Sequence, residues 1–90
     1  MKVCVLYRPN AEYSRQVEEF AHDFEKRMGK HLDLVDIDSK DGIAFASLYD
    51  VNDHPAIVAT ANDGQILRSW EGPILPLMDE VAFYLQDQDR

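Results

Sequence analysis

The segment from Ala11 to about Met28 constrains the fold more than any other part of the chain. Its apolar side chains recur three or four residues apart, and charged side chains lie between them; the apolar positions are Tyr13, Val17, Phe20, Ala21, Phe24 and Met28. This spacing predicts a long amphipathic helix with one buried face. We expect Asn10 to be its N-cap, Glu12 to lie in its first turn and Gly29 to end it.

Segments with strand character lie on both sides of this helix. Residues 3–7 are all apolar and rich in β-branched side chains, which is typical of a strand buried on both faces. Residues 31–37 alternate between polar and apolar side chains, as a second strand would. A strand, a helix and a second strand in this order predict a right-handed crossover with the two strands parallel.

The second half of the chain predicts a short helix, a hairpin and a closing helix. Asp38 or Ser39 can cap a helix that ends near Leu48, with Ile43, Leu48 and Val51 facing inward. Residues 56–61 and 65–71 read as two strands, and the Asn-Asp-Gly turn at 62–64 joins them into an antiparallel hairpin. Residues 77–85 carry the apolar spacing of the last helix.

Length and charge narrow the functional classes. Ninety residues suffice for one small core, so we expect a single domain over 1–90. The net charge of −8 disfavours nucleic acid and anionic membrane surfaces as partners. No apolar run approaches the length of a membrane span or a signal peptide, which predicts a cytoplasmic protein.

Few residues carry the chemistry of a catalytic or metal site. Cys4, the only cysteine, lies in the first strand and is expected to be a buried apolar residue. His22, His31 and His54 lack the spacing of metal ligands, and no glycine-rich phosphate loop is present. We therefore expect no metal and no cofactor.

The order of elements resembles the thioredoxin-like superfamily in its smallest, glutaredoxin-sized form. The matching pieces are the first strand with its Pro9 loop, residues 51–58 around Pro55, the hairpin turn at 62–64 and Trp70-Glu71-Gly72. The resemblance implies an α/β fold with a four-stranded mixed sheet flanked by helices. It also implies a cis peptide bond before Pro55, facing the start of the first helix.

The sequence departs from this superfamily at its redox positions. Active members carry Cys-x-x-Cys at the start of the first helix, where the free amide groups stabilise a thiolate. Ala11 and Ser14 stand at those two positions here. Since neither side chain can perform thiol–disulfide exchange, the residues argue against oxidoreductase activity.

The resemblance implies a binding groove that does not depend on cysteine. Thioredoxin-like domains hold extended peptides or glutathione beside the cis proline, and the corresponding residues here are Tyr7, Arg8, Pro9, Tyr13, His54, Pro55, Trp70 and Pro73. We expect a non-catalytic domain that binds a protein or an extended peptide and exists as a monomer or weak homodimer. Tyr7 and Trp70 fit equally well as core residues.

Three alternatives remain open from the sequence. One is a glutathione-binding domain, and another is an enzyme that uses Ser14 as nucleophile, His54 as base and Glu12 or Asp53 as orienter. The third is a regulatory protein resembling the KaiB clock proteins, which share a thioredoxin-like state without the Cys-x-x-Cys motif. The well-patterned hairpin favours ordinary thioredoxin topology over this third possibility.

Overall fold

A computed structural model describes residues 2–72 and 74–85 of the chain. Within these residues the elements are β1 (Lys2–Tyr7), α1 (Ser14–Met28), β2 (Asp33–Asp36), α2 (Lys40–Leu48), β3 (Ala56–Thr60), β4 (Ile66–Glu71) and α3 (Met78–Phe83). The strands form one sheet in the order β2-β1-β3-β4. β1 and β2 are parallel, whereas β3 is antiparallel to both β1 and β4. The α/β class and the mixed four-stranded sheet are therefore confirmed.

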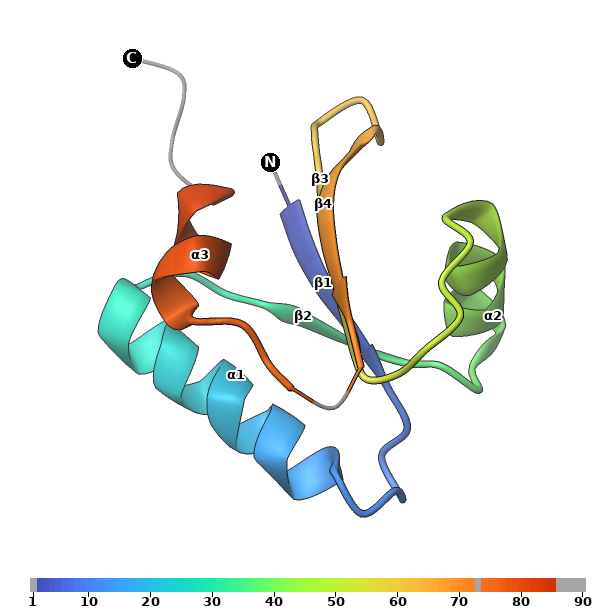
Figure 1. Cartoon of the computed structure of the whole chain (residues 1–90), viewed down its shortest axis with the longest axis horizontal. Helices are drawn as coiled ribbons and strands as arrows, with labels where there is room; N and C mark the ends of the chain where they lie inside the picture. Colours follow the sequence, from blue (N-terminus) through green and yellow to red (C-terminus); the bar gives the residue numbers. More distant parts are fainter. Residues whose placement is uncertain (1, 73, 86–90) are drawn as a thin grey trace.

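The helices lie on both faces of the sheet (Figure 1): α1 and α3 lie on one side and α2 on the other. The larger core cluster joins alternate residues of β1 and β3 to Val17, Ala21 and Phe24 of α1 and to Val81 of α3. A smaller cluster of Leu6, Ala56 and Val58 packs against partly buried side chains that include Phe45 of α2. Both faces of β1 are thus buried, as its unbroken apolar sequence predicts.

α1 begins later than its sequence predicts. Its first helical residue is Ser14, its N-cap is Tyr13 without a side-chain cap, and its first turn contains no acidic residue. Asn10 is therefore not the cap, and Glu12 lies before the helix. The preceding segment forms turns instead, in which Ala11 N–H donates to the Arg8 carbonyl and Ser14 N–H donates to that of Ala11. The predicted end is confirmed, because Gly29 follows in the left-handed conformation with φ 68°.

α2 presents a different face to the sheet than the sequence suggests. Ser39 caps it as expected, with its Oγ accepting from Gly42 N–H. Ile43 and Leu48 are 59% and 74% exposed, however, so their predicted inward orientation is wrong. Gly42 is buried where a Cβ would overlap the carbonyl oxygen of Asp36. This close approach turns Gly42 and Phe45, rather than Ile43, toward the sheet.

The remaining predicted elements are present with shorter bounds. β2 covers Asp33–Asp36 of the expected 31–37, and the hairpin pairs Ala56 to Thr60 with Glu71 to Ile66, with a bulge at its turn end. The closing helix, α3, ends at Phe83. None of the helices in residues 2–72 and 74–85 is long and apolar enough to cross a bilayer.

Candidate functional site

The His54–Pro55 peptide bond is cis and lies directly before β3. Pro55 is itself buried, and its carbonyl accepts a hydrogen bond from Gly72 N–H. The loop before it is held to the end of β4, because Glu71 Oε1 accepts from the N–H groups of Asn52 and Asp53. The expected cis bond is confirmed, and the residue that it presents at the surface is His54, which is half-buried.

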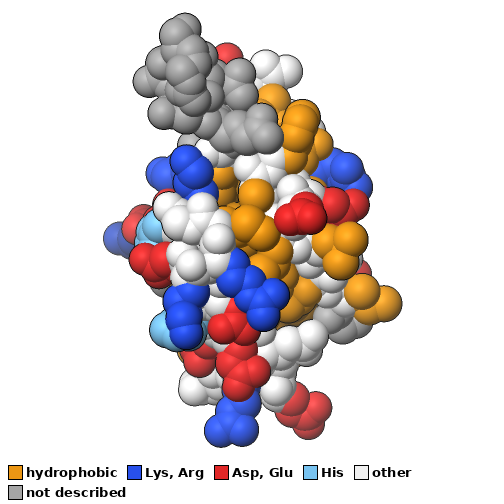
Figure 2. All heavy atoms as spheres, turned by 90° about the vertical axis from the view of Figure 1, so that its left-hand side faces the viewer, with side chains coloured by type: hydrophobic (Ala, Val, Ile, Leu, Met, Phe, Trp, Pro, Cys, Tyr) orange, Lys and Arg blue, Asp and Glu red, His pale blue; other side chains and the backbone are white. Residues whose placement is uncertain are grey.

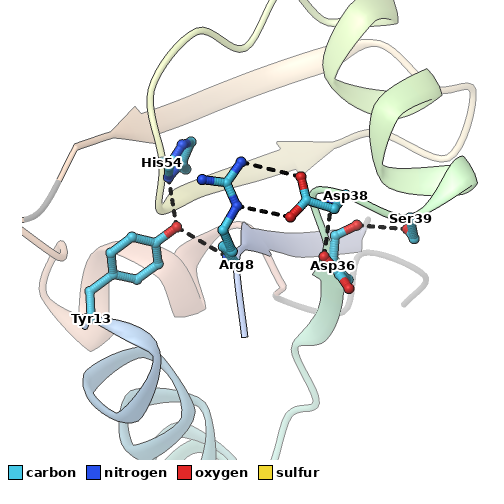
Figure 3. Close-up of polar contacts among 6 residues, drawn as sticks. All are labelled: Arg8, Tyr13, Asp36, Asp38, Ser39 and His54. Carbon is cyan, nitrogen blue, oxygen red and sulfur yellow. Dashed lines mark hydrogen bonds and ion pairs between the residues drawn. The ribbon is translucent and has the colours of Figure 1, made fainter. Parts of the chain in front are cut away.

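Tyr13 connects this bond to the start of α1 (Figure 3). Its hydroxyl oxygen lies 2.6 Å from Nδ1 of His54 and accepts from the backbone N–H of Arg8 at 3.1 Å. With His54 neutral, both groups are satisfied when Tyr13 donates to Nδ1, and we assign the ring proton to Nε2 on this network. The two predicted groove residues Tyr13 and His54 are therefore in direct contact.

Arg8 extends the polar cluster toward β2. Its Nε and Nη2 donate to the two carboxylate oxygens of Asp38 at 2.9 and 3.2 Å, in a paired geometry. Hydrogen bonding to Arg8 holds the pKa of the Asp38 carboxyl below its usual value, and the same pair raises the pKa of Arg8. Asp36 adds to the loop by accepting from Asp38 N–H and, through its carbonyl, from Ser39 Oγ. Both charges of the Arg8–Asp38 pair are largely exposed, so the pair orients Arg8 more than it stabilises the fold.

The backbone polar groups of His54 are unpaired among residues 2–72 and 74–85. In the part of the chain that the structure describes, no hydrogen bond reaches its N–H or its carbonyl oxygen. A half-buried backbone with an unused donor and acceptor can pair with an extended chain, as the edge of a sheet does. We call the surface formed by Arg8, Tyr13 and His54 beside the buried Pro55 the Pro55 groove, after the groove that the resemblance implies.

Ala11 and Ser14, which the resemblance aligns with the redox positions, lie beside this groove. Ser14 is the first residue of α1 and Ala11 lies in the turn before it. Cys4 is buried in β1, as expected, and burial together with the charge of Asp33 raises the pKa of its thiol. The chain therefore has no cysteine at the groove.

The arrangement of Ser14 and His54 that a hydrolytic enzyme would need is not formed. Within the described residues, no hydrogen bond joins Ser14 to His54, and Nδ1 of His54 is occupied by Tyr13 instead of Glu12 or Asp53. The Asp53 backbone faces Glu71. No three His, Cys, Asp or Glu side chains of residues 2–72 and 74–85 come together as they would around a metal ion.

The other predicted groove residues are divided between the surface and the core. Pro9 is exposed in the loop after β1. Tyr7 is only 7% exposed, and its hydroxyl donates to Glu18, so it belongs to the core that supports the groove. Trp70 packs against the larger core cluster and Tyr84, with Arg68 over its ring. Pro73 lies outside the described residues. Tyr7 and Trp70 thus pack in or against the core, which is the second of the two roles that the sequence allows them.

The groove residues predicted from the sequence do not include Asp38 and Glu71, which anchor the groove. Asp38 follows β2 closely, and the carboxyl ends of the parallel strands β1 and β2 meet at one edge of the sheet. That rule could have placed Asp38 beside Arg8. Glu71 ends β4 opposite Ala56 at the start of β3, so the hairpin register could have placed it beside the loop before Pro55.

Comparison with solved structures identifies the class of fold. Thioredoxin 1 from the thermophilic eubacterium Thermosipho africanus TCF52B superposes with a TM-score of 0.66 and 9% identity, over 94% of this chain and 90% of the other. A structure described as that of a malarial protein gives a TM-score of 0.64 and 14% identity, over 92% and 90%. No protein-family model matches the sequence, and no curated protein matches it.

The chain has a thioredoxin-like fold. Within that class, this chain has Ser14 at the start of α1, Ala11 in the turn before it, and its one cysteine in β1.

Proposed function

We propose that this chain is a redox-inactive thioredoxin-like domain that binds an extended segment of a partner protein in the Pro55 groove. The observation that carries the proposal is the unused N–H and carbonyl of His54 beside the cis bond. An extended peptide gains two backbone hydrogen bonds there by lying antiparallel to residues 53–55, as a strand added to a sheet edge does. Tyr13 and Arg8 then contact its side chains, because both lie next to His54.

The side chains at the groove favour binding over chemistry. Ala11 has no ionisable group, and the alcohol of Ser14 lacks an adjacent base. The raised pKa of the Cys4 thiol keeps it protonated inside β1. An unpaired buried thiol is stable in reducing surroundings, which fits a cytoplasmic location. We expect the domain to work as a single unit, in which Glu71 holds the loop before Pro55 in place.

Backbone pairing gives a direct test with synthetic peptides. Extended peptides selected from a random library against the native chain are mapped by NMR, and we expect the shifts to centre on residues 8–14 and 53–56. N-methylation of the one peptide residue that pairs with His54 should abolish binding, whereas N-methylation of its neighbour, whose N–H points away, should not. Equal effects at both peptide positions would show that the backbone of His54 is not used.

Three further measurements test the separate parts of the proposal. Arg8→Ala and Tyr13→Ala should each weaken the selected peptide, whereas Arg68→Ala, in β4 over Trp70 and outside the Pro55 groove, should not. The native chain should not reduce insulin disulfides in the presence of a dithiol, and turnover there would refute the redox-inactive part. Glutathione should leave the NMR signals of residues 8–14 and 54–56 unchanged, and shifts there would favour the glutathione-binding alternative.

A further inference from the structure

A second surface lies between the end of α1 and α3, away from the Pro55 groove. Two adjoining hollows of about 400 and 390 Å³ share Met28 and Asp79 in their walls. Leu77 lines the first hollow and Phe83 lines the second. We call this surface the α1–α3 groove, defined by Arg27, Met28, Lys30, Leu77, Asp79 and Phe83.

The α1–α3 groove exposes large apolar side chains. Leu77, just before α3, is 72% exposed, and Phe83, at its end, is 59% exposed. α3 is short and gives the core one fully buried residue, Val81. A face that leaves two large apolar side chains in water on either side of shallow hollows is typical of an interaction site. Figure 2 shows hydrophobic side chains running along this side of the molecule, with charged side chains bordering them.

The charges beside these hollows are unlike those of the whole chain. Arg27 and Lys30 line the hollows, and Asp79 is the one acidic residue in the described walls. Neither basic side chain is ion-paired within residues 2–72 and 74–85. The chain as a whole carries a net charge of −8, so this rim is a local excess of positive charge on an acidic protein. Carboxylates are the groups that such a rim attracts.

Charge also argues against the other occupants of this surface. A symmetric pair would bring together two chains that each carry a net charge of −8. An anionic membrane would meet the same overall negative charge. A single acidic segment, in contrast, meets chiefly the Arg27 and Lys30 rim, because salt screens charges that lie more than about 10 Å away.

We propose that the α1–α3 groove binds an acidic amphipathic helix of a partner protein. Two apolar side chains one turn apart on that helix enter the two hollows against Leu77 and Phe83, and Asp or Glu side chains beside them face Arg27 and Lys30. The groove is independent of the Pro55 groove, because α1 alone separates its two ends by about 20 Å. One domain can then hold two segments at once, which suits an assembly role.

The test uses a designed amphipathic peptide with Leu and Phe on one face and Glu on the other, and its Lys-for-Glu counterpart. We expect the Glu peptide to shift the NMR signals of Met28, Leu77, Asp79 and Phe83 and to bind less tightly as salt is raised. The Lys peptide should bind at least about tenfold more weakly, the effect of losing two exposed ion pairs. Equal binding of the two peptides, or shifts centred on residues 8–14 and 53–56, would overturn the proposal.

Matched variants separate the charges from the apolar contacts. Arg27→Glu with Lys30→Glu should weaken the Glu peptide about tenfold, whereas Lys26→Glu, which lies outside the hollows, should change it little. Leu77→Ser with Phe83→Ser should abolish binding without unfolding the domain, since both side chains are exposed. Self-association of the native chain that this last variant removes would assign the surface to a second copy. Binding to phosphatidylglycerol vesicles in place of the Glu peptide would assign it to a membrane, and either result would refute the partner-helix proposal.

Discussion

The hydroxyl oxygen of Tyr13 lies 2.6 Å from Nδ1 of His54, joining the residue before α1 to the residue before the cis proline. Glu71 holds the same loop from the opposite side through the N–H groups of Asn52 and Asp53. The loop is thus fixed by one tyrosine and one carboxylate from elements far apart in the sequence. The backbone N–H and carbonyl of His54, within this fixed loop, are unpaired among the described residues.

Tyr13→Phe removes the hydroxyl that bridges His54 and Arg8. We expect the free energy of unfolding to fall by about 1 kcal/mol, the usual net contribution of a part-buried hydrogen bond. The neutral His54 ring should also lose its preference for a proton on Nε2 and become a mixture of tautomers. Ring-nitrogen chemical shifts and urea denaturation measure the two effects. Tyr84→Phe is the control, and an unchanged tautomer in Tyr13→Phe would contradict the assigned network.

Arg8→Gln should raise the pKa of Asp38 toward the ordinary value of a carboxyl, because hydrogen bonding to Arg8 is the main cause of its lowering. A lowered folded-state pKa contributes stability above the unfolded-state pKa, and that contribution is lost as the pH falls through the folded value. Both side chains are exposed, so global stability should change little. NMR titration of the Asp38 carboxyl carbon measures the shift, with Arg15→Gln as control. A pKa that does not move would show that the pair is absent in solution.

The fold could be predicted from the sequence because its strongest signals report burial directly. The apolar spacing in the α1 segment predicts that Phe24 is buried, and the unbroken apolar run of β1 predicts the same for Leu6. Both side chains are 0% exposed in the structure. The start of α1 was not predictable from capping preference. Tyr13 occupies the cap position, and its side chain is committed to Arg8 and His54 rather than to the helix. A tertiary contact here outweighs the local preference for Asn10.

The candidate site could be predicted only in part. Arg8, Tyr13 and His54 follow from the resemblance, whereas their anchors Asp38 and Glu71 depend on contacts between residues 30 and 18 positions apart. The sequence predicts the two strand pairs on which these contacts depend, but it places Asp38 and Glu71 only once the register of each pair is known. The buried face of α2 was predicted wrongly for a similar reason, because nothing in the sequence of the helix itself shows that Asp36 approaches Gly42.

Gly42→Ala tests that close approach. Alanine favours a helix over glycine by about 1 kcal/mol, so propensity alone predicts stabilisation. The added Cβ would overlap the Asp36 carbonyl oxygen, which is backbone and cannot rotate away. We expect a net loss of about 1–3 kcal/mol in the free energy of unfolding. Denaturation of this variant beside Ser47→Ala, at an exposed position of the same helix, gives the comparison, and a more stable Gly42→Ala protein would refute the α2 placement.

Phe24→Ala should come close to unfolding the domain. Phe24 is fully buried between α1 and the sheet, and such truncations cost about 3–5 kcal/mol. Domains of this size have about 5–10 kcal/mol in total. Leu48→Ala is the matched control, because Leu48 is 74% exposed and should lose well under 1 kcal/mol. Thermal unfolding followed by circular dichroism measures the stability of both variants, and comparable losses of stability would contradict the core described for α1.

Tyr7 should make the stability fall at alkaline pH. Burial, and then the hydrogen bond to Glu18, raise the pKa of Tyr7 to about 12 from 10.0. Between these values the unfolded chain ionises this tyrosine while the folded chain keeps its proton, so unfolding releases a proton and the free energy of unfolding falls as the pH rises. Below about pH 10 the phenol is neutral in both states, and this source of pH dependence is absent. Urea denaturation across this range, with tyrosinate absorbance, should show the decline in the native chain and in Tyr84→Phe. The decline of the free energy of unfolding with pH should be shallower in Tyr7→Phe. Equal declines in all three proteins would show that Tyr7 ionises as readily when folded as when unfolded.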